Sequence, residues 1–303
     1  MRNLGASPVP GEGFVNVSGL RLHYLVWNPD GGQDTIVMLH GLRGEASIWA
    51  TVAEPLADQG LRVLALDQRG RGFSDWATDG DYSRAAYVRD LEGLSAALKL
   101  DRFALIGASM GGANAVAFAA VRPDLVTGLV LEDPAIFLPR ADGQVAGQSR
   151  IPNEVNSTPT SFNTWDEAAE YARGRRPTLS GAGLEAYLRA TLKPLDDGRV
   201  TWRYDLEGIR RAMQARRGEH AEQGLWSQVA QVRCPTLILR AAQSDVVSPE
   251  AVAALLASIP TARAVEIPRA GHSIHLDNLS DYMAAVAPFI SSLKRPLGAS
   301  ASA

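Results

Sequence analysis

Short hydrophobic runs recur along the chain and alternate with longer segments whose apolar residues have helical spacing. The runs are of strand length, and they include Ile36–Leu39, Leu61–Leu66, Phe103–Ile106, Gly128–Leu131, Thr236–Arg240 and Ala264–Ile267. A run that is apolar at nearly every position is typical of a strand buried on both faces of a parallel sheet. Helices are predicted between and after these runs, at about Ala46–Gln59, Arg84–Lys99, Gly111–Val121, Pro249–Ser258 and Ser280–Leu293. The alternation predicts a mostly parallel sheet with helices on both faces, which is an α/β fold.

The start of the chain has a different pattern. Phe14–Val17 and Leu20–Trp27 alternate between apolar and polar residues, and Ser18 and Gly19 lie between them. This combination predicts a β-hairpin, because a two-residue turn containing glycine matches the twist of two paired strands. We therefore expect an antiparallel hairpin before the first strand of the parallel sheet.

The alternation of strands and helices is interrupted between about residues 139 and 233. Short helices are predicted there at Asp166–Arg173, Leu184–Leu192 and Leu206–Gln214, separated by Pro and Gly residues. An insertion of this size after a strand end is expected to form a lid over the carboxyl edge of the sheet, where open α/β sheets bind ligands. We expect a core of residues 1–138 and 234–303, and a helical cap of residues 139–233 inserted after the strand that ends near Leu131.

A serine flanked by glycines connects one predicted strand to the following helix. The segment is Gly107-Ala108-Ser109-Met110-Gly111, with a G-x-S-x-G spacing. A sharp strand-to-helix turn of this kind holds the central serine in a strained conformation and exposes its hydroxyl beside the N-terminus of the helix. The helix dipole and free amides there favour a negative charge that develops during acyl transfer. Ser109 is therefore a candidate nucleophile.

A serine nucleophile needs a base to take its proton and an acid to orient that base. Asp245 and His272 each follow a later predicted strand, so the chain supplies Ser, Asp and His in that order at strand ends. Two alternatives remain open. Glu132 or Asp133 follows another strand end and could replace Asp245 as the acid. His275 could replace His272, although Gly271 leaves room for the His272 ring to approach the serine.

Composition narrows the classes of protein and partner. The 303 residues are 46% hydrophobic, which suffices for a sizeable core, and the net charge of −3 shows no basic footprint for nucleic acid or an anionic membrane. The single cysteine, Cys234, excludes an internal disulfide, and no Cys/His cluster indicates structural zinc. Without an apolar leader or a run approaching 18 apolar residues, we expect a soluble cytoplasmic protein.

Together these residues resemble the α/β-hydrolase family from about Phe14 to Leu293. The resemblance is carried by HGLRG at 40–44, DQRGRGFS at 67–74, GASMGG at 107–112, the Asp245 loop and GHSIH at 271–275. The chain is most similar to capped esterases, lactonases, haloperoxidase-like enzymes and carbon–carbon bond hydrolases. This resemblance implies a helical cap over a serine triad and no metal or organic cofactor. It also implies that the backbone N–H groups of Leu42 and Met110 form the oxyanion hole.

Other residues near these motifs have weaker assignments. His40 is expected beside the pocket, where it shapes the oxyanion loop through a hydrogen bond. The segment at 67–74 lacks the pattern of a phosphate loop and is predicted to be a structural turn. Four large side chains of the cap could line a substrate pocket or form the core of the cap, namely Trp165, Trp202, Met213 and Trp226.

The sequence predicts a serine hydrolase that cleaves an ester or lactone of a small, largely apolar molecule through an acyl-enzyme. Within the same class, hydrolysis of a carbon–carbon bond in a vinylogous diketone is the alternative, although Ser273 stands where that subgroup tends to have tryptophan. A non-catalytic ligand receptor on the same fold is the alternative of another class. A small-molecule substrate is the expected partner, and the chain could be a monomer or a homodimer.

Overall fold

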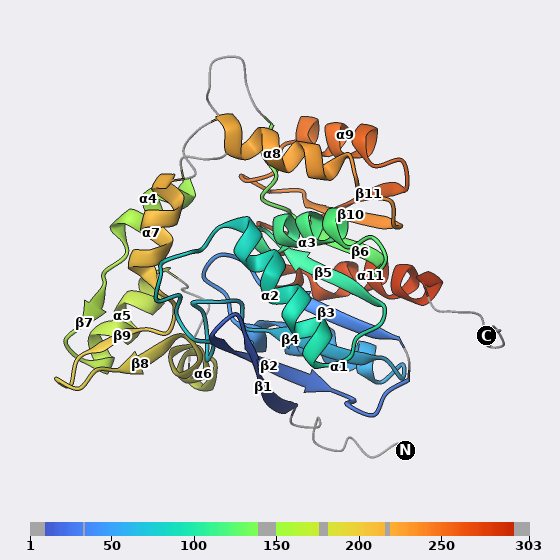
Figure 1. The fold of residues 1–303 in the computed structure, drawn as a ribbon. Helices are drawn as coiled ribbons and strands as arrows, with labels where there is room; N and C mark the ends of the chain where they lie inside the picture. The colour runs from blue at the N-terminus through green and yellow to red at the C-terminus, as the bar shows by residue number, and fades with distance from the viewer. Residues whose placement is uncertain (1–9, 33, 139–149, 176–180, 216–218, 294–303) are drawn as a thin grey trace.

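An eight-stranded sheet forms the centre of the computed structural model, which describes residues 10–32, 34–138, 150–175, 181–215 and 219–293 (Figure 1). In spatial order its strands are β1 (Gly11–Val17), β2 (Leu20–Trp27), β4 (Arg62–Leu66), β3 (Thr35–Leu39), β5 (Phe103–Ala108), β6 (Val126–Glu132), β10 (Thr236–Ala241) and β11 (Ala262–Ile267). β2 pairs antiparallel with β1 and β4, and the other pairs are parallel. The predicted hairpin and mostly parallel sheet are confirmed.

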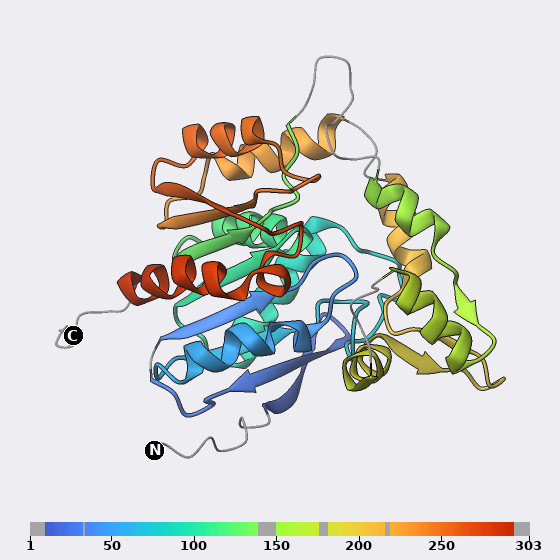
Figure 2. The same cartoon turned by 180° about the vertical axis from the view of Figure 1, so that it is seen from behind.

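Helices cover both faces of the sheet and build a hydrophobic layer on each (Figures 1 and 2). One layer contains α2 (Arg84–Ala97), α3 (Met110–Val121), α8 (Glu219–Val229) and α9 (Pro249–Ser258). The other contains the 3-10 helix η1 (Ala46–Trp49), α1 (Ala50–Ala57) and α11 (Leu279–Leu293). In β5, Phe103 and Leu105 pack into the first layer, and Ala104 and Ile106 pack into the second. Because successive side chains of a strand point to opposite faces, a strand covered on both sides is apolar throughout.

A smaller lobe lies beside the carboxyl ends of the parallel strands (Figures 1 and 2). We call its residues 150–215 the cap lobe. Its helices are α4 (Arg150–Ser157), α5 (Trp165–Arg175), α6 (Gly181–Thr191) and α7 (Leu206–Ala215), and its antiparallel sheet has the order β7 (Ser161–Phe162), β9 (Val200–Trp202), β8 (Leu192–Pro194). The lobe has its own hydrophobic core, in which the Trp202 ring stacks on Tyr204 with a centroid distance of 5.0 Å.

Polar contacts attach the cap lobe to loops at the carboxyl ends of β3 and β4, including one from the Tyr82 hydroxyl to Asp205 Oδ2 at 2.7 Å. The backbone N–H of Asp205 donates to the Gly70 carbonyl at 2.9 Å. Trp76 donates its indole N–H to the Arg203 carbonyl at 2.9 Å. In the loop after β3, Arg43 forms an ion pair with Glu154 of α4 at 2.6 Å. The lobe is therefore tied to the same loops that carry the HGLRG and DQRGRGFS motifs.

The helix α8 packs on the main sheet, although the sequence analysis assigned it to the cap. Its residues Leu225 and Val229 are fully buried in the layer that contains α3. Trp226, on the same helix, donates its indole N–H to the carbonyl of Phe137 at 2.7 Å. The predicted cap boundary at residue 233 therefore includes a helix that belongs to the packing of the core.

Several predicted elements differ in detail from those of the structure. The single helix expected at 46–59 is divided into η1 and α1. The helix expected at 184–192 ends at Thr191, because Leu192 begins β8. The sequence analysis missed all three strands of the cap sheet, which are two or three residues long and too short for a periodic pattern. Residues 139–149 of the expected cap lie outside the described part.

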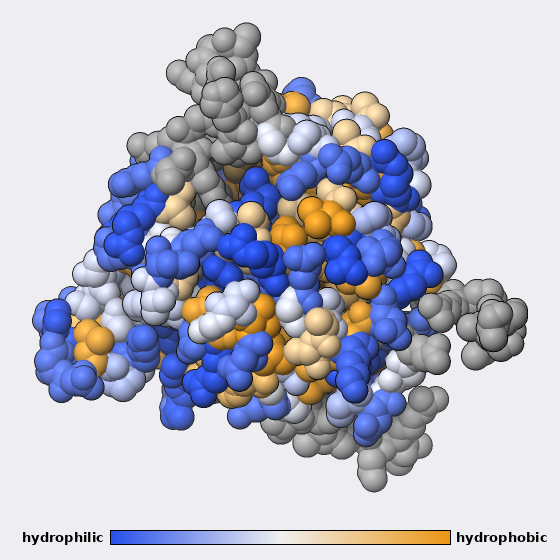
Figure 3. Space-filling view, viewed as in Figure 1, coloured by the Kyte–Doolittle hydropathy of each residue, from blue (hydrophilic) through white to orange (hydrophobic). Residues whose placement is uncertain are grey.

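The surface of the molecule is largely polar on the side seen in Figure 3, where hydrophilic residues separate smaller hydrophobic areas. Among the described residues, no helix has both the length and the apolar composition that a bilayer crossing requires. The large hydrophobic side chains lie mainly in the two layers against the main sheet and in the core of the cap lobe.

Candidate active site

Ser109 lies at the sharp turn between β5 and α3. Its backbone has φ 52° and ψ −114°, a strained conformation for a residue with a Cβ atom. Two hydrogen bonds hold this turn in place, since the Ser109 N–H donates to the Glu132 carbonyl at 2.9 Å and the Ala135 N–H donates to the Ser109 carbonyl at 3.0 Å. The predicted strand–serine–helix geometry is therefore present.

The flanking glycines are required because backbone segments approach closely on both sides of Ser109. A Cβ atom on Gly107 would lie 2.5 Å from the Gly111 carbonyl oxygen, and one on Gly111 would overlap the carbonyl oxygen of Leu39. A Cβ atom on Gly41 would lie 3.5 Å from the Cβ of Ser109, so the loop after β3 runs directly beside the serine side chain. The G-x-S-x-G spacing thus lets three backbone segments meet around one hydroxyl.

A buried carboxylate orients His272. The imidazole Nδ1 lies 2.7 Å from Asp133 Oδ2, and Asp133 has no exposed surface. The carboxylate also accepts hydrogen bonds from the Ser244 hydroxyl at 2.6 Å and from the Ala241 N–H at 3.2 Å. Three donors on three segments therefore fix both the Asp133 carboxylate and the ring that it holds.

The sequence analysis expected Asp245 to supply this carboxylate, with Glu132 or Asp133 as the alternative. In the structure Asp133 is bonded to His272, and Asp245 is an exposed residue of the loop after β10. That loop contributes the hydroxyl of Ser244, which accepts the N–H groups of Val246 and Val247 while donating to Asp133. Asp133 directly follows β6, the neighbour of the Ser109 strand, and was the alternative that the sequence left open.

Neighbouring strands bring Ser109 and Asp133 to the same edge of the sheet. β5 and β6 pair in parallel, with Ala108 opposite Glu132, so Ser109 and Asp133 are the next residues of each chain segment. Asp133 then binds His272, which follows β11. Side chains at the carboxyl ends of adjacent parallel strands share one edge of the sheet, where open α/β sheets bind their ligands.

His40 fixes the peptide that carries the Leu42 N–H, the first amide expected in an oxyanion hole. Its Nε2 accepts the Gln68 N–H at 3.1 Å, so its Nδ1 carries the proton and donates to the Gly41 carbonyl at 2.7 Å. The Gly44 N–H donates to the same carbonyl at 3.1 Å. In a trans peptide the N–H points opposite to the C=O, so these bonds direct the Leu42 N–H away from His40.

Burial keeps His40 in this neutral form. The side chain has no exposed surface, and desolvation is the main cause that lowers the His40 pKa to about 4. The nearby Arg71 guanidinium lowers that pKa further, while Asp67 and the Gly41 carbonyl act in the opposite direction. His40 is thus a buried support of the oxyanion loop.

The second amide expected in an oxyanion hole belongs to Met110, the first residue of α3. Amides in the first turn of a helix have no partner within the helix. The Ser109 carbonyl of the same peptide accepts hydrogen bonds from Ala113 and Ala135, which directs the Met110 N–H to the opposite side. Both expected donors are therefore in peptides whose orientation is fixed by hydrogen bonds.

A second histidine lies next to the first but in different surroundings. His275 is buried, and its Nδ1 lies 2.8 and 2.9 Å from the two carboxylate oxygens of Glu132. Its ring stacks on Trp49 with a centroid distance of 4.4 Å and an interplanar angle of 19°. Glu132 and His275, the alternatives to the acid and the base in the sequence analysis, thus bind each other beneath the Asp133–His272 pair.

The expected pocket residues lie in different parts of the molecule. Trp202 and Met213 pack in the core of the cap lobe, and Trp226 packs against the main core. Trp165, at the start of α5, is 42% exposed. These contacts favour a structural role for Trp202, Met213 and Trp226. The hydrogen bonds of His40 described above likewise favour a structural role for that residue.

Sequence reasoning missed two polar residues that hydrogen-bond to groups of the site, Ser244 and Arg71. Ser244 stands one position before the expected Asp245, and nothing in a single sequence distinguishes its hydroxyl as a donor to Asp133. Arg71 was included in a structural turn, but it is 1% exposed and donates to the Leu42 carbonyl at 3.1 Å. Among the described residues, no group of three or more His, Cys, Asp and Glu side chains could hold a metal ion.

Comparisons with known proteins agree with this geometry. The chain is 29% identical to the sn-1-specific diacylglycerol lipase of Mus musculus over 92% of this chain and 88% of that protein. It is also 29% identical to the N-formylmaleamate deformylase of Pseudomonas putida over 92% of this chain and 96% of that protein. The relatives are hydrolases, so this chain is an enzyme of that class.

Solved structures and a family model give the same result. The crystal structure of E-2-(acetamidomethylene)succinate hydrolase superposes with a TM-score of 0.77, covering 93% of this chain and 100% of that chain at 24% identity, which supports the fold. The family model described as "alpha/beta hydrolase fold" matches residues 34–279, which include Ser109, Asp133 and His272. The chain therefore belongs to the α/β-hydrolase family.

Proposed function

We propose that the protein is a serine hydrolase that cleaves a carboxylic ester or lactone of a small, largely apolar molecule through an acyl-enzyme. The observation that carries the proposal is the hydrogen bond between His272 Nδ1 and the buried Asp133 carboxylate, at the sheet edge where Ser109 occupies its strained turn. A neutral imidazole whose Nδ1 is held by a carboxylate presents its Nε2 as a base.

In the first half-reaction, Ser109 Oγ attacks the carbonyl carbon of the substrate while His272 Nε2 takes the hydroxyl proton. Asp133 stabilises the imidazolium that forms. The carbonyl oxygen becomes an oxyanion, which the Leu42 and Met110 N–H groups bind. These amides are already oriented by His40, Gly44, Ala113 and Ala135, so no reorganisation accompanies the development of charge.

The first half-reaction ends when His272 gives its proton to the oxygen of the leaving alcohol, and the acyl group remains on Ser109. In the second half-reaction, water loses a proton to His272 and attacks the acyl carbon. The second tetrahedral intermediate then collapses to the free acid as His272 returns this proton to Ser109 Oγ. In a lactone, the leaving alcohol and the acid belong to one molecule.

Two kinds of substrate should be distinguished within this proposal. The diacylglycerol lipase relative is named for an ester substrate, and the deformylase relative for removal of a formyl group. We propose the ester or lactone because its cleavage needs only a serine nucleophile and a histidine that protonates the leaving alkoxide. Ser109 and His272 can supply both. The carbon–carbon alternative is tested with a vinylogous diketone.

The test uses p-nitrophenyl acetate and butyrate, an aliphatic lactone, an N-formyl amide and a vinylogous diketone, each with wild type and Ser109→Ala. We expect turnover of esters or the lactone by wild type, and loss of at least about 10⁴-fold in kcat/KM in Ser109→Ala. A fluorophosphonate should label wild type at Ser109 in a ratio of one to one. Turnover that survives Ser109→Ala would refute the serine mechanism, and binding without turnover of any compound would favour the receptor alternative.

A further inference from the structure

Arg71 connects the two residues whose amides form the proposed oxyanion hole. Its Nε donates to the Leu42 carbonyl at 3.1 Å, and its Nη2 lies 3.8 Å from the Met110 sulfur. Its Nη1 donates to the Arg69 carbonyl at 2.8 Å and to the Tyr87 hydroxyl at 2.5 Å. The planar guanidinium thus contacts two segments, the loop after β3 and the start of α3, that are 68 residues apart in the chain.

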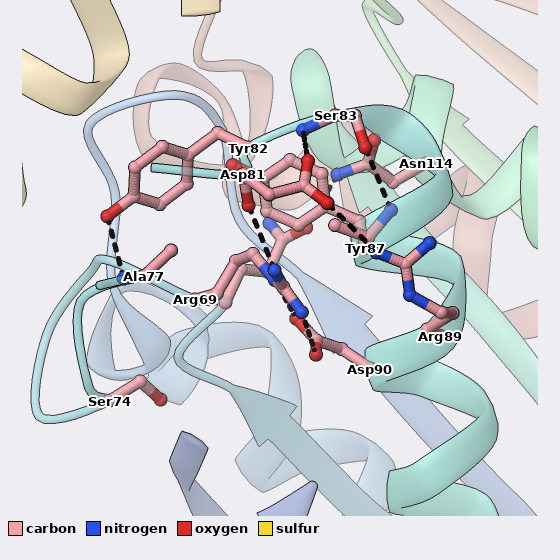
Figure 4. Close-up of polar contacts among 12 residues, drawn as sticks. Arg69, Ser74, Ala77, Asp81, Tyr82, Ser83, Tyr87, Arg89, Asp90 and Asn114 are labelled. Atoms are coloured by element: carbon pink, nitrogen blue, oxygen red, sulfur yellow. Dashed lines mark hydrogen bonds and ion pairs between the residues drawn. The ribbon is translucent and has the colours of Figure 1, made fainter. Parts of the chain in front are cut away.

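The charge of Arg71 has a different environment from that of its neighbour Arg69. Arg69 binds the Asp90 carboxylate with two hydrogen bonds of 2.6 Å, as Figure 4 shows. For Arg71, the described residues provide carbonyl and hydroxyl oxygens, a sulfur and two aromatic rings, but no carboxylate within ion-pair distance. Arg71 is nevertheless 1% exposed. A positive charge in this position is neither paired nor screened by water.

This buried charge lies close to the groups of the reaction. The guanidinium lowers the pKa of His40, the residue that orients the Leu42 amide. The guanidinium contacts the carbonyl of Leu42 and the side-chain sulfur of Met110, the two residues whose N–H groups would bind the oxyanion. A fixed positive charge at low dielectric favours a negative charge nearby, and the ground-state ester has no such charge.

We propose that Arg71 is a positioning residue of the oxyanion hole, which holds Leu42 and Met110 together and directs its unpaired positive charge toward the tetrahedral intermediate. The inference rests on the proposed serine hydrolase function. It assigns a catalytic contribution to the segment at 67–74, which the sequence analysis treated as a structural turn. It also gives a reason why, among the described residues, Arg71 has no carboxylate partner of the kind that Arg69 has: a carboxylate would cancel the charge.

The experiment compares two inhibitors that differ in one property. A trifluoromethyl ketone forms a hemiketal with the serine, whose oxygen is an oxyanion, whereas the corresponding secondary alcohol binds without forming a charge. In Arg71→Met we expect the affinity for the trifluoromethyl ketone to fall by about 10²- to 10³-fold, with a matching fall in kcat. The affinity for the alcohol and KM should change by less than about threefold, because ground-state binding is unaffected.

Three further variants separate charge, geometry and folding. Arg71→Lys keeps the charge but loses the planar fork, and should recover part of the loss. Tyr87→Phe removes the hydroxyl oxygen that accepts a hydrogen bond from Arg71. The affinity for the ketone should fall about threefold to tenfold, and the affinity for the alcohol should not change. Arg122→Met, at the far end of α3, is the matched control and should behave as wild type. If Arg71→Met does not fold, Arg71→Lys and Tyr87→Phe carry the test.

The outcomes distinguish this inference from the proposed function. If wild type forms no hemiketal by ¹⁹F NMR, or if Ser109→Ala binds the ketone equally well, the proposed function fails. If wild type forms the hemiketal but the Arg71 and Tyr87 variants bind it as tightly, the role of Arg71 is refuted. Equal losses for the ketone and the alcohol would also refute it, because they would indicate only a change of pocket shape.

Discussion

Two adjacent residues, Glu132 and Asp133, each bind a histidine of the segment that follows β11, yet the two pairs differ in what they can do. The His272 side chain is 20% exposed and its partner Asp133 is fully buried. The His275 side chain is 2% exposed and Glu132 is fully buried. Both pairs have a carboxylate within 2.8 Å of Nδ1. Hydrogen bonding alone therefore does not make a catalytic pair; access of the second ring nitrogen to substrate does.

The end of β6 explains why the two pairs diverge. Glu132 is the last residue of the strand, and it binds His275 beside Trp49, in the hydrophobic layer that contains α1 and α11. Asp133 leaves the strand with φ 40°, a left-handed conformation that Asp tolerates better than most residues. The change of direction moves the next carboxylate toward Ala241, Ser244 and His272. The structural pair Glu132–His275 and the proposed catalytic pair Asp133–His272 thus begin at consecutive residues of the chain.

The largest expected difference follows from the same substitution in each histidine. His272→Asn should lower kcat/KM by about 10⁴- to 10⁶-fold, because the serine loses its base. His275→Asn should leave kcat within about tenfold but lower the free energy of unfolding, because it breaks a buried pair. Ester hydrolysis and urea denaturation measure the two effects. Equal losses of activity would show that both histidines act in the reaction.

The assignment of the acid is tested by two aspartate substitutions. Asp133→Asn should lower kcat about 10⁴-fold, since an amide no longer holds the correct imidazole tautomer. Asp245→Asn, the matched control in the loop after β10, should change kcat by less than about threefold. A steady-state assay on one ester suffices. The reverse ranking would restore Asp245 as the orienting acid.

The structural pair is tested by its carboxylate. Glu132→Gln should lower the free energy of unfolding by about 3–5 kcal/mol, because one partner of a buried pair is removed. The reaction should be slowed much less than in Asp133→Asn. Chemical denaturation at pH 7 gives the stability, and the same samples give kcat. Unchanged stability would mean that the Glu132–His275 contact contributes nothing net to folding.

Another buried carboxyl, that of Glu45, extends the comparison because, among the described residues, its hydrogen bonds are to Ser47 and not to a histidine. Burial raises the Glu45 pKa to about 7 from 4.5. The folded state therefore binds more protons than the unfolded state between these values, and the contribution of Glu45 to stability falls as the pH rises toward 7.

Glu45→Gln should remove this loss. Between pH 5 and pH 8, the free energy of unfolding of the variant should therefore rise by about 2–3 kcal/mol relative to that of wild type. His40 has the opposite sign, because its lowered pKa makes stability fall as the pH drops below 6.5. The difference between variant and wild type isolates Glu45, since His40 is common to both. A difference that is constant with pH would contradict the raised pKa.

Much of the core follows from the sequence because its strands are buried on both sides. β3 and β5 are buried at every position, and their short length and the turn residues beside them indicate strands. The elbow is equally local, since Gly107, Ser109 and Gly111 define it within five residues. The fold class and the positions of Ser109 and His272 at strand ends could therefore be derived from the chain alone.

The parts that could not be derived depend on contacts between distant segments. Asp133 and Asp245 both follow strands, and the contacts of His272, Ser244 and Ala241 with Asp133 distinguish them. α8 has the composition of the cap but packs on α3. Arg71 stands in a glycine-rich turn, and its contacts with Leu42 and Met110 come from two other loops.

The attachment of the cap lobe has a consequence for engineering by exchange of modules. The Gly70 carbonyl holds the lobe through Asp205, and the adjacent Arg71 holds Leu42, whose neighbour Arg43 binds the lobe again through Glu154. A chimaera that receives only residues 150–215 from a relative would combine a new cap lobe with core residues that do not match its contacts. Transferring residue 43 and residues 67–76 together with the lobe would keep the lobe, its contacts with the core and Arg71 from the same relative.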